Sequence, residues 1–118
     1  KAGENLELVL HWQALEQPEG DYTVFTHLVG EDGKIWGQHD APPQNGARAT
    51  STWLDGEVIS DEHVISVAAD APEGQYHIAV GMYQPTSGER LAVTKLGKQA
   101  TRADRVILPT NVNVPASP

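Results

Sequence analysis

Residues 53–93 constrain the fold of this chain more than any other segment. They contain three strand-like patterns, two glycine-centred turns and a tyrosine that opens a strand, with no helical period. Within this stretch, His63, Ile65 and Val67 alternate with Val64 and Ser66. A period of two residues is typical of a strand with one buried face. The segment therefore predicts antiparallel β-structure and indicates no particular chemistry.

The same period of two recurs near the N-terminus, where Leu6, Leu8, Leu10 and Trp12 alternate with other side chains. It predicts a strand over residues 6–13. Residues 22–29 are apolar on both faces, as in a central strand, and the Asp-Gly pair at 32–33 predicts a hairpin turn. Further strands are expected at 35–39, 50–53, 58–68, 75–83, 90–94 and 104–114, with loops at 40–49 and 95–103.

Seven or eight short strands between turns predict an all-β fold, an immunoglobulin-like or fibronectin-III-like antiparallel β-sandwich. Tyr76 favours this fold because it follows a Pro/Gly corner, where its hydroxyl can bond back to the backbone. Pro109 predicts an edge position or a bulge in the last strand. A chain of 118 residues fits one domain over 1–114 with a linker-like tail at 115–118. The expected core is Leu6, Leu8, Leu10, Trp12, Val24, Leu28, Ile65, Val67, Tyr76, Ile78, Val80 and Met82.

Composition narrows the possible partners. The chain carries 16 acidic and 8 basic residues, a formal net charge of −8, and the basic residues look scattered, with no Lys/Arg cluster. We therefore expect no nucleic-acid binding and no binding to anionic membranes. No apolar run approaches the roughly twenty residues of a membrane helix, so we expect no direct membrane insertion. Because the chain starts at Lys1, we interpret it as a mature product or an excised domain. We also expect it to be monomeric in isolation.

Catalytic and metal-binding motifs are absent from the sequence. There is no G-x-S-x-G, no H-E-x-x-H, no phosphate loop and no Cys, so we expect no catalytic residues and no cofactor. Asp61 and His63 would share one face of a strand, a spacing that suits two metal ligands. A metal site needs three or four ligands, however, so we expect Asp61 to cap a loop and His63 to be partly buried. His27 lies among apolar neighbours, and we expect it to be a buried structural residue.

Aromatic side chains are the better functional lead, because flat aromatic rings stack on the C–H faces of sugars. Trp12 is in phase with the leucines of its strand, so we assign it to the core. Trp53 immediately precedes a turn, and the core is the favoured interpretation for it too. Trp36 follows the Asp-Gly hairpin and is expected to be the most exposed tryptophan. The candidate ligand-binding residues are Trp36, Trp53, Tyr83, Gln38 and Asp40, with Gln84 beside them.

A set of short motifs spread over residues 5–114 carries a family resemblance. The motifs are Trp12-Gln13-Ala14, Asp21-Tyr22-Thr23-Val24-Phe25, His27-Leu28, Trp53, Gly56-Glu57, Ala71-Pro72, Gly74-Gln75-Tyr76 and Gly88-Glu89-Arg90-Leu91. With these motifs the chain resembles a β-sandwich module of bacterial, Chloroflexi-like cell-envelope proteins. That module is frequently the C-terminal extracytoplasmic domain of membrane glycosyltransferases of the protein-mannosyltransferase kind. Trp36 departs from the pattern, since a small aliphatic residue is usual there.

The resemblance implies an extracytoplasmic location and no activity of the module's own, because the family's catalytic residues belong to its membrane portion. We therefore expect a non-catalytic accessory or interaction module of a larger cell-envelope protein, such as a membrane glycosyltransferase. Its partners would be other domains of that protein or a glycan. The alternative is a carbohydrate-binding module that uses exposed aromatic residues. A third possibility is a subunit that assembles through its edge strands, against which Pro109 argues.

Overall fold

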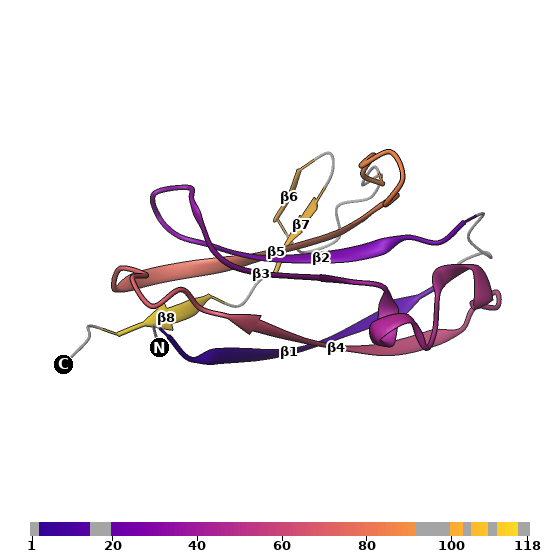
Figure 1. Ribbon diagram of the computed structural model, residues 1–118, viewed down its shortest axis with the longest axis horizontal. Coiled ribbons are helices and arrows are strands. Elements are labelled where there is room, and N and C mark those ends of the chain that lie inside the picture. The colour runs from indigo at the N-terminus through magenta and orange to yellow at the C-terminus, as the bar shows by residue number, and fades with distance from the viewer. Residues whose placement is uncertain (1–2, 15–19, 92–99, 103–104, 109–110, 116–118) are drawn as a thin grey trace.

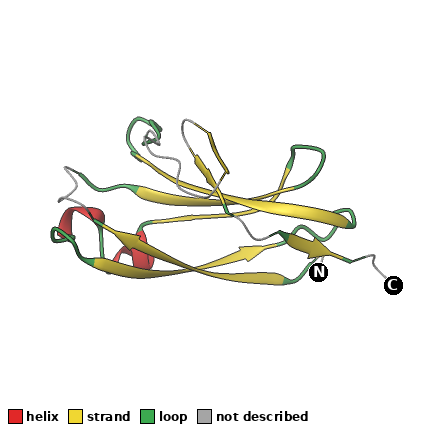
Figure 2. Cartoon of the chain, turned by 180° about the vertical axis from the view of Figure 1, so that it is seen from behind, coloured by secondary structure: helices red, strands yellow, loops and turns green. Residues whose placement is uncertain are grey.

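In the computed structural model, residues 3–14, 20–91, 100–102, 105–108 and 111–115 are described. They form two layers of antiparallel strands in a sandwich-like arrangement, with no α-helix among the described residues (Figures 1 and 2). The all-β prediction is therefore confirmed. The strands are β1 (Asn5–Gln13), β2 (Thr23–Val29), β3 (Ile35–Ala41), β4 (Val58–Ser66), β5 (Gly74–Tyr83), β6 (Ala100–Arg102), β7 (Arg105–Ile107) and β8 (Val112–Val114).

The two layers differ in size. The smaller layer pairs β1 with β4 along their full nine residues. The larger layer has the strand order β3-β2-β5-β7-β6, and β8 pairs with the first residues of β5. As predicted, the strands around residues 22–29 and 75–83 are central, because β2 lies between β3 and β5 and β5 lies between β2 and β7.

Side-chain alternation separates core from surface on each strand. Along β4, Ile59 and Ile65 are buried, whereas Val58 and Val64 point to solvent. Opposing residues of β2 and β5 fill the space between the layers, where apolar burial is the main stabilising contribution. All twelve expected core residues belong to this region, with Leu6, Leu8 and Trp12 half-buried at its margin.

One long edge of the sandwich is closed where β3 meets β4. A side chain on Gly37 would come within 2.8 Å of the Ile65 Cγ2 atom and of the Ser66 carbonyl oxygen, so the two backbones approach closely only because this residue is glycine. The Ala68 N–H donates to the Trp36 carbonyl, 2.8 Å away, across the same edge. This contact fixes how β4 sits over the larger layer.

The opposite edge, along β1, is open in the described part of the chain. There β1 pairs with β4 alone among the described strands. A groove of about 160 Å³ lies beside this edge, between the smaller layer and the far side of the larger one. Its lining is mainly apolar and comprises Leu10, His11, Trp12, Val80, Val106 and Leu108.

Several sequence predictions need correction. The strand expected at 50–53 is a 3-10 turn, Thr50–Thr52, because the Thr50 hydroxyl binds the Gly20 carbonyl and accepts the Tyr22 N–H. These hydrogen bonds hold the segment in a turn and keep it from pairing as a β-strand. The expected loop at 40–49 begins later, since β3 continues to Ala41, and it contains a second 3-10 turn at Pro43–Gly46.

The C-terminal predictions are also partly wrong. The polar connection expected at 95–103 contains β6, and the strand expected at 104–114 is divided into β7 and β8. Pro109, to which we attributed the interruption, lies outside the described residues, as do residues 92–94 of the strand expected at 90–94. In the described part of that expected strand, the backbone of Arg90 pairs with Tyr83 in an isolated β-bridge. The Tyr76 prediction is confirmed, because its hydroxyl donates to the Pro72 carbonyl at 2.6 Å.

Substitutions at two neighbouring residues of β4 test whether its side chains alternate between core and solvent. We expect Ile65→Ala to lower the free energy of unfolding by about 2–5 kcal/mol, since it leaves a cavity at a fully buried site. Val64→Ala, next to it on the 45 % exposed side, should cost less than about 1 kcal/mol. Urea denaturation followed by tryptophan fluorescence measures both. Equal losses in the two variants would mean that the faces of β4 are misassigned.

Candidate functional site

A polar cluster lies in the interior, between the two layers. Asp61 and His63 project inward from β4 and are 0 % and 1 % exposed. The Asp61 Oδ2 atom is 2.6 Å from His63 Nε2 and 3.2 Å from the indole nitrogen of Trp12 on β1. Its other oxygen, Oδ1, accepts the backbone N–H of Gln44 at 2.8 Å. The carboxylate thus receives donors from three segments of the chain.

The cluster continues across to the larger layer through His39 on β3. The Nδ1 atoms of His39 and His63 lie 2.8 Å apart, with the rings nearly perpendicular. A carboxylate only accepts hydrogen bonds, so the Nε2 atom of His63 carries a proton directed at Asp61. When both rings are neutral, His63 Nδ1 is therefore the acceptor and His39 Nδ1–H the donor. The space between these two nitrogens holds one proton and not two.

Electrostatics keep Asp61 ionised. Burial acts to raise the pKa of its carboxyl, but the hydrogen bonds from His63, from the Gln44 amide and from Trp12 outweigh burial and lower the pKa below 3.8. A buried carboxylate with these partners joins β1, β4, the 3-10 turn at Pro43–Gly46 and, through His63, β3. Its chemical role in this arrangement is to hold the layers together.

Asp61 and His63 are arranged like the Asp and His of a hydrolytic triad, which would also need a nucleophilic hydroxyl bonded to the histidine ring. In the described part of the chain, no Ser or Thr hydroxyl is bonded to the ring of His39 or His63. Within the same residues, no three His, Cys, Asp or Glu side chains are grouped so that they could hold a metal ion. The ring of His63 uses both nitrogens inside the cluster, which leaves it no atom for a substrate.

Part of this cluster was predicted. Asp61 does cap a loop by accepting a backbone amide, and it does share a face with His63. His63 is more buried than the expected partial burial. The contact between His39 and His63 and the donation from Trp12 were missed, because each joins strands that are distant in sequence and depends on their register.

The five candidate ligand-binding residues lie in three separate places. Trp53 is 3 % exposed, packs into the core and donates its indole N–H to the Arg48 carbonyl at 2.8 Å, so it offers no face to a ligand. Trp36 lies near the start of β5, beside Tyr76, whereas Tyr83 ends that strand. Tyr83 lies seven positions after Tyr76 along the strand, or about 23 Å at 3.3 Å per position, too far for one small sugar to span.

Trp36 lines a cleft of about 180 Å³ at one end of the sandwich. Its indole N–H is bonded to the carboxylate of Asp32 at 3.2 Å, and Glu31 accepts the Gln75 N–H at 2.9 Å. The side chain is half-buried, with the cleft walls restraining it. This volume lies below the range of about 300–1,000 Å³ that small-molecule sites usually have, so the cleft suits a small chemical group. The remaining lining residues are Pro72, Glu73, Gly74 and Tyr76.

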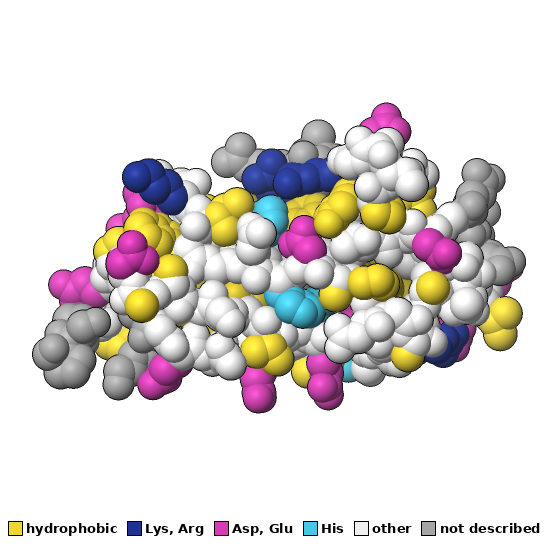
Figure 3. Space-filling model, viewed as in Figure 1, with side chains coloured by type: hydrophobic (Ala, Val, Ile, Leu, Met, Phe, Trp, Pro, Cys, Tyr) yellow, Lys and Arg dark blue, Asp and Glu magenta, His cyan; other side chains and the backbone are white. Residues whose placement is uncertain are grey.

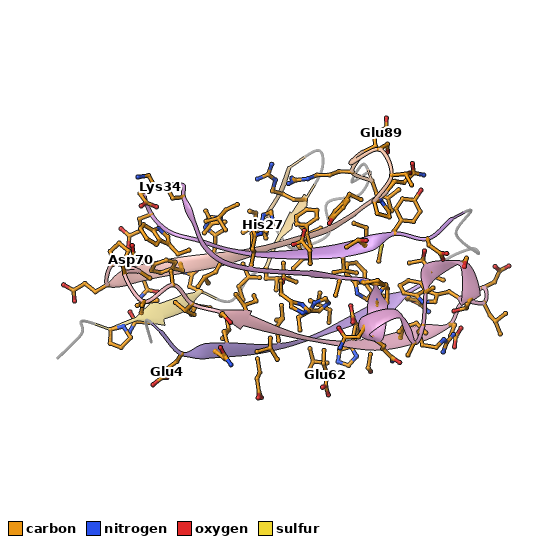
Figure 4. All side chains as sticks on the ribbon, in the orientation of Figure 1. Glu4, His27, Lys34, Glu62, Asp70 and Glu89 are labelled. Atoms are coloured by element: carbon orange, nitrogen blue, oxygen red, sulfur yellow. The ribbon has the colours of Figure 1, made fainter. Side chains whose placement is uncertain are left out.

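Gln38, Asp40 and Tyr83 share the outer face of the larger layer, the face turned away from β1 and β4. Asp40 pairs with Phe25 of β2, and Gln38 pairs with His27. The Tyr83 hydroxyl donates to Asp40 Oδ2 at 3.0 Å, and burial together with Asp40 raises the pKa of Tyr83, so the hydroxyl keeps its proton. Figure 4 shows His27 on this outer side of β2.

Phe25 and His27 form the buried floor of this outer face, with ring centroids 4.9 Å apart. The prediction that His27 is buried is confirmed. Burial lowers the pKa of His27; Asp40 opposes this shift, while the positive charges of Arg90 and Arg105 add to it. The Arg90 guanidinium lies 4.3 Å from the centre of the Phe25 ring, a cation–π contact. Two arginines missed by the sequence analysis therefore belong to this face.

Comparisons with known proteins identify no relative: no family model, curated protein or solved structure matches the chain. Within the described residues, no helix is long and apolar enough to cross a bilayer.

The pH dependence of stability tests the role of Asp61. Its folded-state pKa is depressed, so it stabilises the fold above its unfolded value of 3.8, and this stability is lost as the pH falls through and below that value. We expect Asp61→Asn to cost about 1–3 kcal/mol at pH 7, because both carboxylate oxygens accept buried hydrogen bonds and the NH₂ group of Asn would face one of those donors. The variant should also lose less stability than the parent between pH 6 and pH 3.

Urea denaturation at both pH values measures these effects, and Asp32→Asn is the matched control. Asp32 is also a carboxylate with a lowered pKa, caused first by the Lys34 amide, but it lies at the surface. Asp32→Asn should lower the free energy of unfolding at pH 7 far less than Asp61→Asn does. A wild-type stability that is flat between pH 6 and pH 3 would contradict the assignment.

Proposed function

We propose that this domain is a non-catalytic accessory module of a larger cell-envelope protein, that it lies outside the cytoplasm, and that its fold is of the immunoglobulin or fibronectin-III kind. The strand pairing supports this fold, since β1 pairs with β4 in one layer and β2 with β5 in the other. So does the hydroxyl of Tyr76, which bonds back to the chain at Pro72.

The open edge along β1 is the observation that carries the interaction role. Backbone groups on that side of β1 have no strand partner among the described residues, and an apolar groove runs beside them. An exposed edge next to an apolar groove is where another polypeptide adds a strand, with main-chain hydrogen bonds and alternate side-chain contacts. The occupant we propose is another domain or linker of the same envelope protein.

Hydrogen exchange tests this role. We expect the backbone amides of β1 to exchange more slowly in the longer parent protein than in the isolated domain, because pairing protects them. The amides of β2, already paired on both sides, serve as the internal control and should not change. Equal exchange of β1 in the two proteins would rule out this edge as the interface.

Carbohydrate binding is the second candidate function. It is favoured by the grouping of Gln38, Asp40 and Tyr83 on one face, where amide, carboxylate and aromatic side chains lie together. The Trp36 cleft is a separate aromatic site at the end of the sandwich. The two sites make different predictions and can be told apart by substitution.

A glycan array with three proteins tests the second candidate. If the outer face binds sugar, Tyr83→Ala should abolish binding at millimolar glycan while Trp36→Ala leaves it unchanged. If the cleft binds sugar, the two variants should behave in the opposite way. Val58→Ala, a change at an exposed position of β4, is the control for surface substitution. A wild-type domain that binds no glycan at millimolar concentration would eliminate the candidate.

A further inference from the structure

Asn45 and Gly46 form the only Asn-Gly step in the sequence. In such a step the asparagine side chain can react with the backbone, because glycine has no side chain to shield its own amide nitrogen. The other asparagines precede Leu or Val, whose branched side chains hinder that nitrogen; they are Asn5, Asn111 and Asn113. Asn45 and Gly46 are exposed, and nothing lies within 4 Å of the point where a Gly46 Cβ would be. The step is therefore accessible to water.

The 3-10 turn that contains this step has a left-handed backbone. Gln44 has φ 52° and ψ 41°, Asn45 has φ 53° and ψ 34°, and Gly46 has φ 93°. Glycine adopts this region without steric cost, whereas Gln44 is strained in it. The turn packs against β4 (Figure 1), where the Gln44 N–H donates to Asp61 Oδ1 at 2.8 Å. The side-chain Nε2 of Gln44 also donates to the Ser60 carbonyl at 2.6 Å, so two hydrogen bonds hold the strained turn closed.

In the closed turn the two groups that would react are turned away from each other. Reaction needs the Gly46 nitrogen within bonding reach of the Asn45 Cγ atom, on the same side of the chain as Cβ. At a ψ of 34° the Gly46 nitrogen lies near the side of Asn45's own backbone nitrogen, and therefore away from Cβ. The turn must open before the two atoms can meet. The hydrogen bonds from Gln44 to β4 oppose that opening.

We propose that Asn45 is a deamidation site whose rate is controlled by the hydrogen bonds between Gln44 and β4. When the turn opens, the Gly46 nitrogen gives its proton to hydroxide and attacks Asn45 Cγ. A C–N bond forms, the bond from Cγ to the side-chain nitrogen breaks, and that nitrogen takes a proton from water and leaves as ammonia. Water then opens the resulting succinimide ring. Cleavage at Cγ gives aspartate, and cleavage at the backbone carbonyl gives isoaspartate.

The isoaspartate product cannot restore the closed turn. Its main chain runs through Cβ and Cγ and is one carbon longer, which displaces the backbone next to Gln44. Its carboxylate adds a negative charge to a protein whose net charge is already −8. Figure 3 shows acidic side chains along the lower part of the visible face, over the smaller layer. Deamidation therefore releases the Gln44 amide from Asp61 and loosens the turn irreversibly.

Peptide mapping by mass spectrometry during incubation at pH 8 tests the proposal, since replacing NH₂ by OH changes the mass of the peptide that holds residue 45. We expect Asn45 to convert about tenfold to a hundredfold more slowly in the folded domain than in the same chain unfolded in urea, because two hydrogen bonds oppose opening. In urea, Asn45 should convert faster than the other asparagines.

Three variants show whether local opening sets the rate in the folded domain. Gln44→Ala keeps a Cβ, and with it the left-handed strain, but loses the bond to the Ser60 carbonyl, so it should speed conversion at least threefold. Asp61→Ala removes the acceptor of the Gln44 N–H and should speed it at least as much. Ile65→Ala is the matched control, because it destabilises β4 through a buried cavity away from the turn and should leave the rate within twofold of wild type.

Several results would overturn the proposal. Folded protein that converts less than tenfold more slowly than unfolded protein would refute control by the turn. A wild-type rate in Gln44→Ala would do the same, and so would an Ile65→Ala rate raised as much as that of Gln44→Ala, since conversion would then follow global unfolding. No conversion at Asn45 in the folded protein after a hundred half-lives of the unfolded chain would refute the site. If Asp61→Ala fails to fold, as judged by thermal denaturation, Gln44→Ala decides alone.

The consequence for the turn is tested on the isoaspartate product, which ion-exchange chromatography separates from the unmodified protein by its added charge. Its Gln44 amide should exchange with solvent at least tenfold faster than in the unmodified protein, because the bond to Asp61 is lost. Asn45→Asp is the control, since it adds the same charge without lengthening the main chain, and it should retain the protection. Equal protection of the Gln44 amide in the isoaspartate product would show that the turn survives and would contradict the release.

Discussion

The buried carboxylate of Asp61 is the constraint on which the rest of the structure depends. An ion without water in a protein interior needs hydrogen bonds from every side, and it receives them from Trp12, His63 and the Gln44 amide. These partners come from both strands of the smaller layer and from a connecting turn. The ring of His63 is in turn hydrogen-bonded to the ring of His39 in the larger layer. A single charged group thus aligns the two layers.

This arrangement divides the chemistry of the domain between inside and outside. The residues that look most reactive in the sequence, Asp61 and His63, direct their polar atoms at each other and at structural partners. The residues available to a ligand or a partner lie on the surface: the open edge of β1, the cleft at Trp36 and the polar outer face around Asp40. A rigid interior with several recognition surfaces agrees with the accessory role that we propose.

The sequence predicted the fold where local pattern determines it. Alternation in β1 and β4 identified their inner faces, and the corner before Tyr76 identified its hydroxyl bond. The sequence did not predict the structure where contacts between distant strands determine it, because a local period carries no information about which strands pair. Thr50 bonds to Gly20 and Tyr22, thirty and twenty-eight residues earlier, and thereby turns a strand-like segment into a 3-10 turn. Likewise, His39 meets His63 only because β3 and β4 close one edge of the sandwich. The arginines of the outer face were overlooked because a local period does not show which face they occupy; Arg90, for example, reaches the Phe25 ring only in the folded chain.

The imidazole protons of His63 test the central claim most directly, because the position of those protons follows from Asp61 being an ionised acceptor. Long-range ¹⁵N–¹H correlation spectra at pH 7 identify the protonated nitrogen of each ring. The account predicts that Nε2 of His63 carries a proton, that this proton exchanges slowly with water, and that its signal moves in Asp61→Asn. A His63 ring protonated on Nδ1 alone, or an Nε2 proton in fast exchange with solvent, would contradict it.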